Sequence, residues 1–440
     1  MPKPLRTRRA PWCAPLLAIA VLTVPTVTRA QAGAVQLQAT EAPLTLPRAL
    51  ELARANGPGA RTASARRDIA IGRTREQQQY PNPTIEWRRE NLGSSLQPDI
   101  FATVYLPVDV TGRRVALRKA GAQGQQRATA DATAARRDAE LNAARSWLHA
   151  AMLRGQVEIA RTQAASFDEV AAVDSTRARE GIVAVGVALR TGLEADRART
   201  VLAVLQGEHA RARAELARVV GVDDAGLLAL GSLDSPAMPV APDSATARNV
   251  AVAARPELAA RDAGLREAEA RLTAERRGVV GDWQLQGGSK ETGGFLTGQV
   301  GLSVPFPVFN RNDGARQRAR GEVAEARALR DDAHLAVRAD AVAALSAYDA
   351  MKALAGSART LAERGREVAA IARTSYREGQ ATLTELLDAE RAAADAMTSQ
   401  LRWAVDAWLA RLELERALGA RLDADSPLDL PLISSIRIGS

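Results

Sequence analysis

The sequence predicts a mainly helical protein with a small β part, built from two long antiparallel helical hairpins that each follow a pair of strands. Residues 108–235 and 308–426 contain no proline. Since proline costs about 3 kcal/mol in a helix interior, such stretches can hold very long helices. Residues 295–304 alternate between apolar and polar side chains, which is typical of a strand with one apolar face. Landmarks of the first half also recur 198 residues later, as Pro58 and Pro256 illustrate.

Each proline-free stretch contains one interior break, and both breaks include the triplet Arg-Glu-Gly. Glycine can end a helix by adopting the left-handed conformation. We therefore predict one helical hairpin over residues 112–221 with its tip near Gly181. A second hairpin is predicted over residues 312–419 with its tip near Gly379.

The spacing of 198 residues holds at four landmarks, which indicates internal duplication. The pairs are Pro58 with Pro256, Pro107 with Pro305, Gly181 with Gly379, and Gly221 with Gly419. We accordingly divide the chain into a signal peptide (1–32), a first repeat (33–221), an inter-repeat linker or equatorial segment (222–245), a second repeat (246–419) and a C-terminal tail (420–440).

Strand pairs are predicted before each hairpin, within residues 83–107 and 282–304. More than half of the aromatic side chains outside the signal segment lie in residues 80–109 and 282–309. This concentration is expected of an aromatic girdle at a membrane interface; a small soluble sheet with an aromatic core is the alternative. About eight strands is the smallest closed barrel in outer membranes, so several chains would have to contribute.

The first residues predict export from the cytoplasm. A basic segment precedes apolar residues 14–27, and Ala30-Gln31-Ala32 supplies a small-residue cleavage site. The single cysteine, Cys13, lies in this segment. The mature chain would therefore contain neither disulfides nor thiolate metal sites.

The charge distribution argues against nucleic-acid binding. The net charge is +8, but five of the 59 basic residues lie in residues 1–32, which hold no Asp or Glu, leaving 54 basic against 51 acidic residues. Opposite charges alternate along the predicted helices, as on solvated helix faces. No later stretch approaches the roughly 20 consecutive apolar residues of a membrane-spanning helix.

Two predicted strand-to-helix junctions carry a family resemblance. They read Leu-Pro-Val-Asp-Val-Thr-Gly-Arg-Arg (106–114) and Val-Pro-Phe-Pro-Val-Phe-Asn-Arg-Asn-Asp-Gly (304–314). Both resemble the junctions of the TolC family of outer-membrane efflux proteins, in particular its CzcC-like cation-efflux branch. Proline before a helix and glycine at a sharp turn suit such a junction. The matching positions are Pro107, Gly112, Pro305, Pro307 and Gly314 at the junctions, with Gly181, Ile182, Val183 and Ala184 at the first tip.

The resemblance extends from about residue 46 to residue 419 and implies a passive exit duct. It implies a homotrimer in the outer membrane of a Gram-negative bacterium, with a 12-stranded β-barrel continued by a helical tunnel across the periplasm. The implied partners are a periplasmic adaptor (membrane fusion protein) and an inner-membrane pump of the RND type. Heavy-metal cations are the favoured cargo, and drugs are the alternative.

The resemblance also places an acidic gate just after the second tip, at Glu385 and Asp388. Spacing i, i+3 puts both carboxylates on one helix face, so three copies would form negative rings that attract cations. Without the resemblance, ordinary solvated helix charges are the simpler interpretation.

A polar latch between the tips is a further feature that the resemblance suggests. Tyr376 matches one member of the latch, whereas its acidic partner falls on Val187 and an arginine position on Ala381. We therefore expect the latch to be absent or built differently, with Arg377 or Arg373.

No residue pattern predicts catalysis, a metal site or a cofactor. The three histidines, His149, His209 and His334, are isolated in predicted helices, whereas a metal site needs converging ligands. The alternatives to a duct are a periplasmic adaptor or structural coiled-coil protein outside the membrane, and a soluble helical enzyme. An adaptor usually has one hairpin, and the enzyme lacks any site.

Overall fold

The structure is a computed structural model that describes residues 43–91, 98–223, 225 and 229–436. The predicted signal peptide, residues 1–32, and the last residues of the tail, 437–440, lie outside the described residues.

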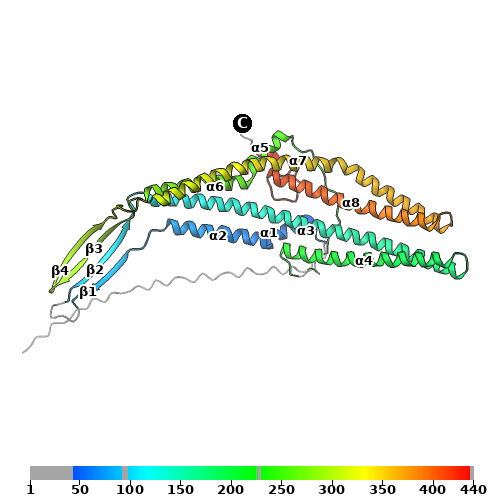
Figure 1. Ribbon diagram of the computed structural model, residues 1–440, viewed down its shortest axis with the longest axis horizontal. Helices are drawn as coiled ribbons and strands as arrows, with labels where there is room; N and C mark the ends of the chain where they lie inside the picture. The colour runs from blue at the N-terminus through cyan, green and yellow to red at the C-terminus, as the bar shows by residue number, and fades with distance from the viewer. Residues whose placement is uncertain (1–42, 92–97, 224, 226–228, 437–440) are drawn as a thin grey trace, which may run out of the picture. The chain divides into compact units, whose positions relative to one another are not determined.

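The described chain is mainly helical with one small sheet, which confirms the predicted fold class (Figure 1). The same order of elements occurs twice along the described chain. The first half contains α1 (Leu46–Asn56), α2 (Pro58–Gln78), β1 (Thr84–Arg89), β2 (Ile100–Val108), α3 (Arg113–Arg179) and α4 (Val185–Val220). The second half contains α5 (Ser244–Ala254), α6 (Pro256–Arg277), β3 (Trp283–Thr292), β4 (Phe295–Ser303), α7 (Asp313–Arg377) and α8 (Leu383–Leu418), followed by the short helix η2 (Ile433–Ser435).

The helices pack side by side in a layer in which each long helix contacts one set of neighbours near the sheet and another near the tips. The first part of α3 packs between α2 and α6, and its later part packs between α4 and α8. Helix α7 packs against α6 and then against α8. The order of helices across the layer is therefore α2–α3–α6–α7 near the sheet and α4–α3–α8–α7 near the tips. Helices α2, α4 and α7 thus lie at its edges.

Alanine dominates the helix contacts. The buried side chains of α3 include Ala143, Ala144, Ala150 and Ala151, with occasional large residues such as Trp147. Small side chains let helix axes approach closely. A broad apolar core is therefore unnecessary, and the helices can form a thin wall.

The sheet is antiparallel throughout, in the order β1-β2-β3-β4. Leu285 of β3 pairs with Leu106 of β2 on one side and with Leu302 of β4 on the other. Because paired residues share a face of the sheet, the register gathers the apolar residues on one face. These side chains are exposed: Ile85, Trp87, Val104, Leu106, Leu285, Leu296, Val300 and Leu302.

The opposite face of the sheet is polar and hydrogen-bonded. The Tyr105 hydroxyl donates to the Glu86 carboxylate at 2.7 Å, and the Gln299 amide donates to the Thr103 hydroxyl at 2.9 Å. The sheet thus has one polar face and one apolar face that no other element of the described chain covers.

Candidate functional site

The second hairpin tip is built by local backbone signals. Helix α7 ends at Arg377, and Gly379 adopts the left-handed conformation with φ of 75°. The Gln380 N–H donates to the Ser375 carbonyl at 2.8 Å, which satisfies a carbonyl at the helix end. The first tip has the same geometry at Gly181, with φ of 77°. Both tips thus lie where the glycines predicted them.

Glu385 caps the helix that follows the second tip. Its carboxylate accepts from the Thr382 N–H at 2.7 Å, and the Thr382 hydroxyl accepts from the Glu385 N–H at 3.3 Å. This reciprocal pair is a capping box. The hydrogen bond from the Thr382 backbone lowers the pKa of Glu385. The first tip has no such cap, because Ala184 stands at the corresponding position.

Glu385 and Asp388 are both exposed, three residues apart on α8. Between them, Leu386 is buried against Val170 and Tyr376. The apolar contact fixes the rotation of α8, so the two carboxylates point away from the packed face. The structure brings them together in one chain, and their role as a gate stays a prediction.

A buried hydrogen bond ties the two hairpins together near their tips. The Tyr376 hydroxyl of α7 donates to the Asp174 carboxylate of α3 at 2.6 Å, and Asp174 is fully buried. Burial, and then this hydrogen bond, raises the pKa of Tyr376. The acidic partner of Tyr376 within the chain is therefore Asp174, not a residue at position 187, and a latch built differently from the family's stays a prediction.

The sequence did carry a signal for Asp174. The buried residues Ala160, Ala164, Phe167, Val170 and Asp174 follow one face of α3 at steps of three and four. An acidic residue at a core position of such a stripe requires a partner. Ala381, which stands at the predicted arginine position, packs partly buried beside the same cluster.

Arginines add ion pairs around this contact. Arg377 pairs with Glu169 of α3 at 2.7 Å, and both side chains are exposed. Arg373 pairs with the buried Glu390 of α8 at 2.8 Å. Burial raises the pKa of Glu390, and Arg373 opposes that shift. The two arginines named as substitutes for the latch thus both bind carboxylates within the chain.

The first strand-to-helix junction is capped by an aspartate. The Asp109 carboxylate accepts from the backbone N–H groups of Thr111, Arg113 and Arg114, the last at 2.7 Å. Gly112 is left-handed there, with φ of 70°. Pro107 lies in β2, at the strand end that leads into this turn.

The second junction differs from the prediction. Pro305 and Pro307 lie between β4 and α7, but Gly314 lies inside the first turn of α7. The left-handed residue is Asn312, with φ of 59°, and its side-chain amide donates to the Glu275 carbonyl at 2.9 Å. Asparagine tolerates this conformation because its short side chain bonds nearby groups, so Gly314 is not needed for the turn.

Among the described residues, no cluster of three or more His, Cys, Asp or Glu side chains could hold a metal ion. Over the same part of the chain, no helix combines the length and apolarity that a membrane crossing requires.

Solved structures show which fold this arrangement represents. The Vibrio cholerae outer membrane protein VceC shares 18% identity over 86% of this chain and 97% of its own, with a TM-score of 0.70. The open state of the Neisseria gonorrhoeae MtrE outer membrane channel shares 17% identity over 87% and 91%, with a TM-score of 0.71. The Campylobacter jejuni CmeC outer membrane channel shares 14% identity over 85% of each chain, with a TM-score of 0.73. The chain has the TolC-like fold.

Sequence comparison adds a family match for the second half of the chain. Residues 247–420 match the family model described as outer membrane efflux protein. This stretch begins in α5 and ends just after α8. No curated protein sequence matches the chain at a significant level. The second half thus matches the efflux family in sequence, and the described chain shares the fold of solved outer membrane channels.

Proposed function

We propose that this chain is the outer-membrane exit duct of a tripartite efflux system. It would passively conduct substrate that an inner-membrane pump delivers through a periplasmic adaptor. The observation that carries this proposal is the sheet with one exposed apolar face, continuous with two helical hairpins whose long helices have 67 and 65 residues. At 1.5 Å per residue, each long helix measures roughly 100 Å.

The apolar face of the sheet supports insertion in a membrane. Val300 is 86% exposed and Ile85 is 75% exposed, although both are strongly apolar. Contiguous exposed apolar surface marks a membrane or a protein interface. A periplasmic adaptor or a coiled-coil protein outside the membrane would leave this face in water, so the duct is favoured over these alternatives.

The free edges of the chain support assembly into a trimer. The edge strands β1 and β4 each lack one neighbour in the four-stranded sheet, and unpaired edges favour further pairing. Three copies would supply twelve strands. Exposed apolar side chains also follow two of the edge helices, namely Val185, Leu189 and Leu193 on α4 and Leu354, Leu361 and Val368 on α7. A head-to-tail contact of unlike edges can close into a ring.

The tips would face the adaptor and form the gate. Three copies of Glu385 and Asp388 would place carboxylates around the aperture, as in cation channels. We therefore propose cations as the preferred permeant ions and an RND-type pump as the energy source. The resemblance of the first junction to the CzcC-like branch favours heavy-metal cations over drugs as cargo.

Envelope fractionation with detergent gels tests the proposed function. The protein should appear in the outer-membrane fraction, and an unheated sample should migrate as an oligomer that heating converts to the single chain. A soluble periplasmic pool of the single chain would overturn the proposal and favour the adaptor or coiled-coil alternative.

A further inference from the structure

Cationic side chains gather where the helices meet the sheet. Four stretches of the chain converge there, and together we call them the junction band: residues 73–80, 109–120, 271–282 and 305–320. The Arg114 guanidinium pairs with the Asp282 carboxylate at 3.1 Å and donates to the Gln79 carbonyl at 3.4 Å. The Asn312 amide donates to the Glu275 carbonyl at 2.9 Å. These contacts bring the four stretches together at one level of the chain.

The junction band holds an unequal share of the charge. Of the 54 basic and 51 acidic residues after position 32, the band contains 13 and 5, so carboxylates outnumber cations over the remaining positions. Along the sequence, these cations are spread over four separate stretches. Only the fold concentrates them, which is why the sequence showed no basic patch.

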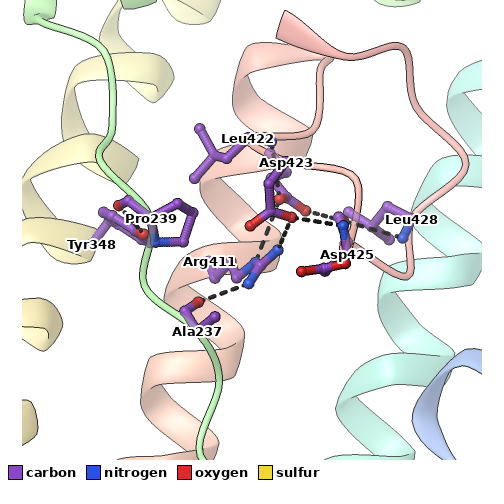
Figure 2. Close-up of polar contacts among 10 residues, drawn as sticks. Ala237, Pro239, Tyr348, Arg411, Leu422, Asp423, Asp425 and Leu428 are labelled. Atoms are coloured by element: carbon purple, nitrogen blue, oxygen red, sulfur yellow. Dashed lines mark hydrogen bonds and ion pairs between the residues drawn. The ribbon is translucent and has the colours of Figure 1, made fainter.

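Most cations of the band are unlike cations that hold a fold together. Ten of the 13 are exposed, and among the described residues eight pair with no carboxylate, including Arg118, Arg276 and Arg311. Figure 2 shows the contrasting case of Arg411, which is 1% exposed and donates to the Asp423 carboxylate at 2.6 Å. The band therefore presents positive charge that an anionic partner can reach.

Exposed aromatic side chains lie among these cations. Tyr80 is 59% exposed, and the guanidinium groups of Arg114 and Arg118 lie 5.2 and 5.1 Å from the centre of its ring. Phe306 and Phe309, in the second junction, are 86% and 101% exposed. Aromatic side chains at the ends of membrane-spanning strands are typical of the boundary between hydrocarbon and headgroups.

The exposed apolar face of the sheet begins at the junction band. Strands β2, β3 and β4 have nine, ten and nine residues, which is the length of a strand that crosses a bilayer. At the other end of the sheet the charges are paired, because Arg88 lies 3.2 Å from Glu90 and Lys290 lies 4.0 Å from Asp99. The excess of cations thus borders the apolar face on the side of the helices.

We propose that the junction band binds the anionic phosphate headgroups of the membrane leaflet on the helix side. This inference rests on the proposed function, because it requires the sheet to be inserted, and it adds a lipid partner of defined charge. Acyl chains contact the exposed apolar face, while guanidinium groups donate to the phosphate oxygens. The exposed aromatic side chains beside the cations favour this role over cations that line the passage.

Lipid titration of the purified oligomer in detergent tests this inference. Native mass spectrometry measures the binding of phosphatidylglycerol, which is anionic, and of phosphatidylethanolamine, which has no net charge. The wild type should prefer phosphatidylglycerol. Arg118→Gln/Arg276→Gln/Arg311→Gln should bind it at least about fivefold more weakly, since one cation near an anionic surface has this effect. Binding of phosphatidylethanolamine should stay unchanged, and Arg118→Lys/Arg276→Lys/Arg311→Lys should keep the preference.

The matched control removes the same charge outside the band. Arg190, Arg364 and Arg402 are exposed arginines of α4, α7 and α8, so Arg190→Gln/Arg364→Gln/Arg402→Gln should bind phosphatidylglycerol as the wild type does. An equal loss in this control, or unchanged binding in the glutamine variant of the band, would overturn the inference. Unchanged lipid binding together with a shifted reversal potential would also overturn it, because the three arginines would then line the passage.

Lipid binding and ion conduction are measured separately. An oligomer that prefers phosphatidylglycerol but conducts no ions would contradict the duct function and support the lipid-binding band. A conducting oligomer without a lipid preference would overturn the lipid-binding band alone.

Discussion

At the residue scale, Glu385 combines two physical tasks in one side chain. Its carboxylate closes the capping box with Thr382 at the start of α8, and its charge is exposed beside that of Asp388. Glutamine also forms capping boxes. Substitution by glutamine therefore separates the charge from the cap, whereas alanine removes both.

Glu385→Gln/Asp388→Asn should weaken the cation preference of the proposed channel, because it removes two negative charges per chain from the tips. The reversal potential in planar bilayers under a salt gradient measures this preference, and the thermal midpoint should stay near that of the wild type. Glu385→Ala should lower the midpoint as well. Glu363→Gln, an exposed carboxylate elsewhere on α7, is the control. Equal reversal potentials in the wild type and all variants would show that Glu385 and Asp388 do not form the gate.

Tyr376→Phe should destabilise the tips, because it leaves the buried Asp174 carboxylate without its donor. A buried group that loses its partner costs about 1–3 kcal/mol. The pH dependence has a definite sign. Since the pKa of Tyr376 is raised in the folded state, its stabilising contribution is complete below the unfolded pKa of about 10 and declines as the pH rises above it.

Thermal unfolding of the wild type and of Tyr376→Phe between neutral and strongly alkaline pH checks this sign. The difference between the two proteins should shrink as the pH rises above about 10. Tyr80→Phe, at an exposed tyrosine, should follow the wild type throughout. A difference that stays constant over the alkaline range would contradict the proposed role of the hydroxyl.

At the scale of the element, the strand-to-helix junctions show how the ends of the two longest helices are fixed. Asp109 satisfies three N–H groups at the start of α3. At the second junction, the Asn310 side chain accepts from one backbone group of the described chain, the Asn312 N–H, at 3.0 Å. The two repeats therefore depend on their caps to different degrees.

Asp109→Ala should lower stability by about 0.5–2 kcal/mol, the usual cost of losing a helix cap. Asn310→Ala should cost less, because it removes a single backbone contact. The stability of the two variants is compared by the temperature at which each oligomer dissociates on a detergent gel. A larger loss from Asn310→Ala would contradict this assignment of the caps.

The sheet offers a paired test of its two faces. Val300 lies on the exposed apolar face, and its neighbour Gln299 lies on the polar face. Val300→Lys should destabilise the membrane-inserted form by about 2–4 kcal/mol, the cost of lysine at the bilayer midplane. Gln299→Lys adds the same charge on the other face and should be tolerated. The yield of heat-sensitive oligomer in the outer membrane measures both, and equal yields would contradict a lipid-facing Val300.

At the scale of the whole molecule, the arrangement of elements could be predicted because its signals are local. The predicted hairpin of residues 112–221 matches helices at Arg113–Arg179 and Val185–Val220. Proline-free runs, the two tip glycines and alternating side chains each determine the backbone conformation of residues close to them in the sequence. The predicted and observed strand ends consequently differ by only one or two residues.

The side-chain contacts that hold the molecule together could not be predicted in the same way. Tyr376 meets Asp174 across 202 positions, and Arg411 binds a carbonyl of the distant inter-repeat segment. Such pairs depend on which helices are neighbours in the folded chain. The periodicity of a single helix shows which of its faces is buried, but it does not identify the neighbouring helix. The junction at Asn312 was missed because glycine was assumed to be the left-handed residue.

The proposed function requires that the assembled chain encloses a conducting pore. The most direct test is ionic conductance of the purified oligomer in a planar bilayer. We predict stable conductance steps with a preference for cations. Oligomers that insert into the bilayer without conducting, or that conduct with a preference for anions, would contradict the account.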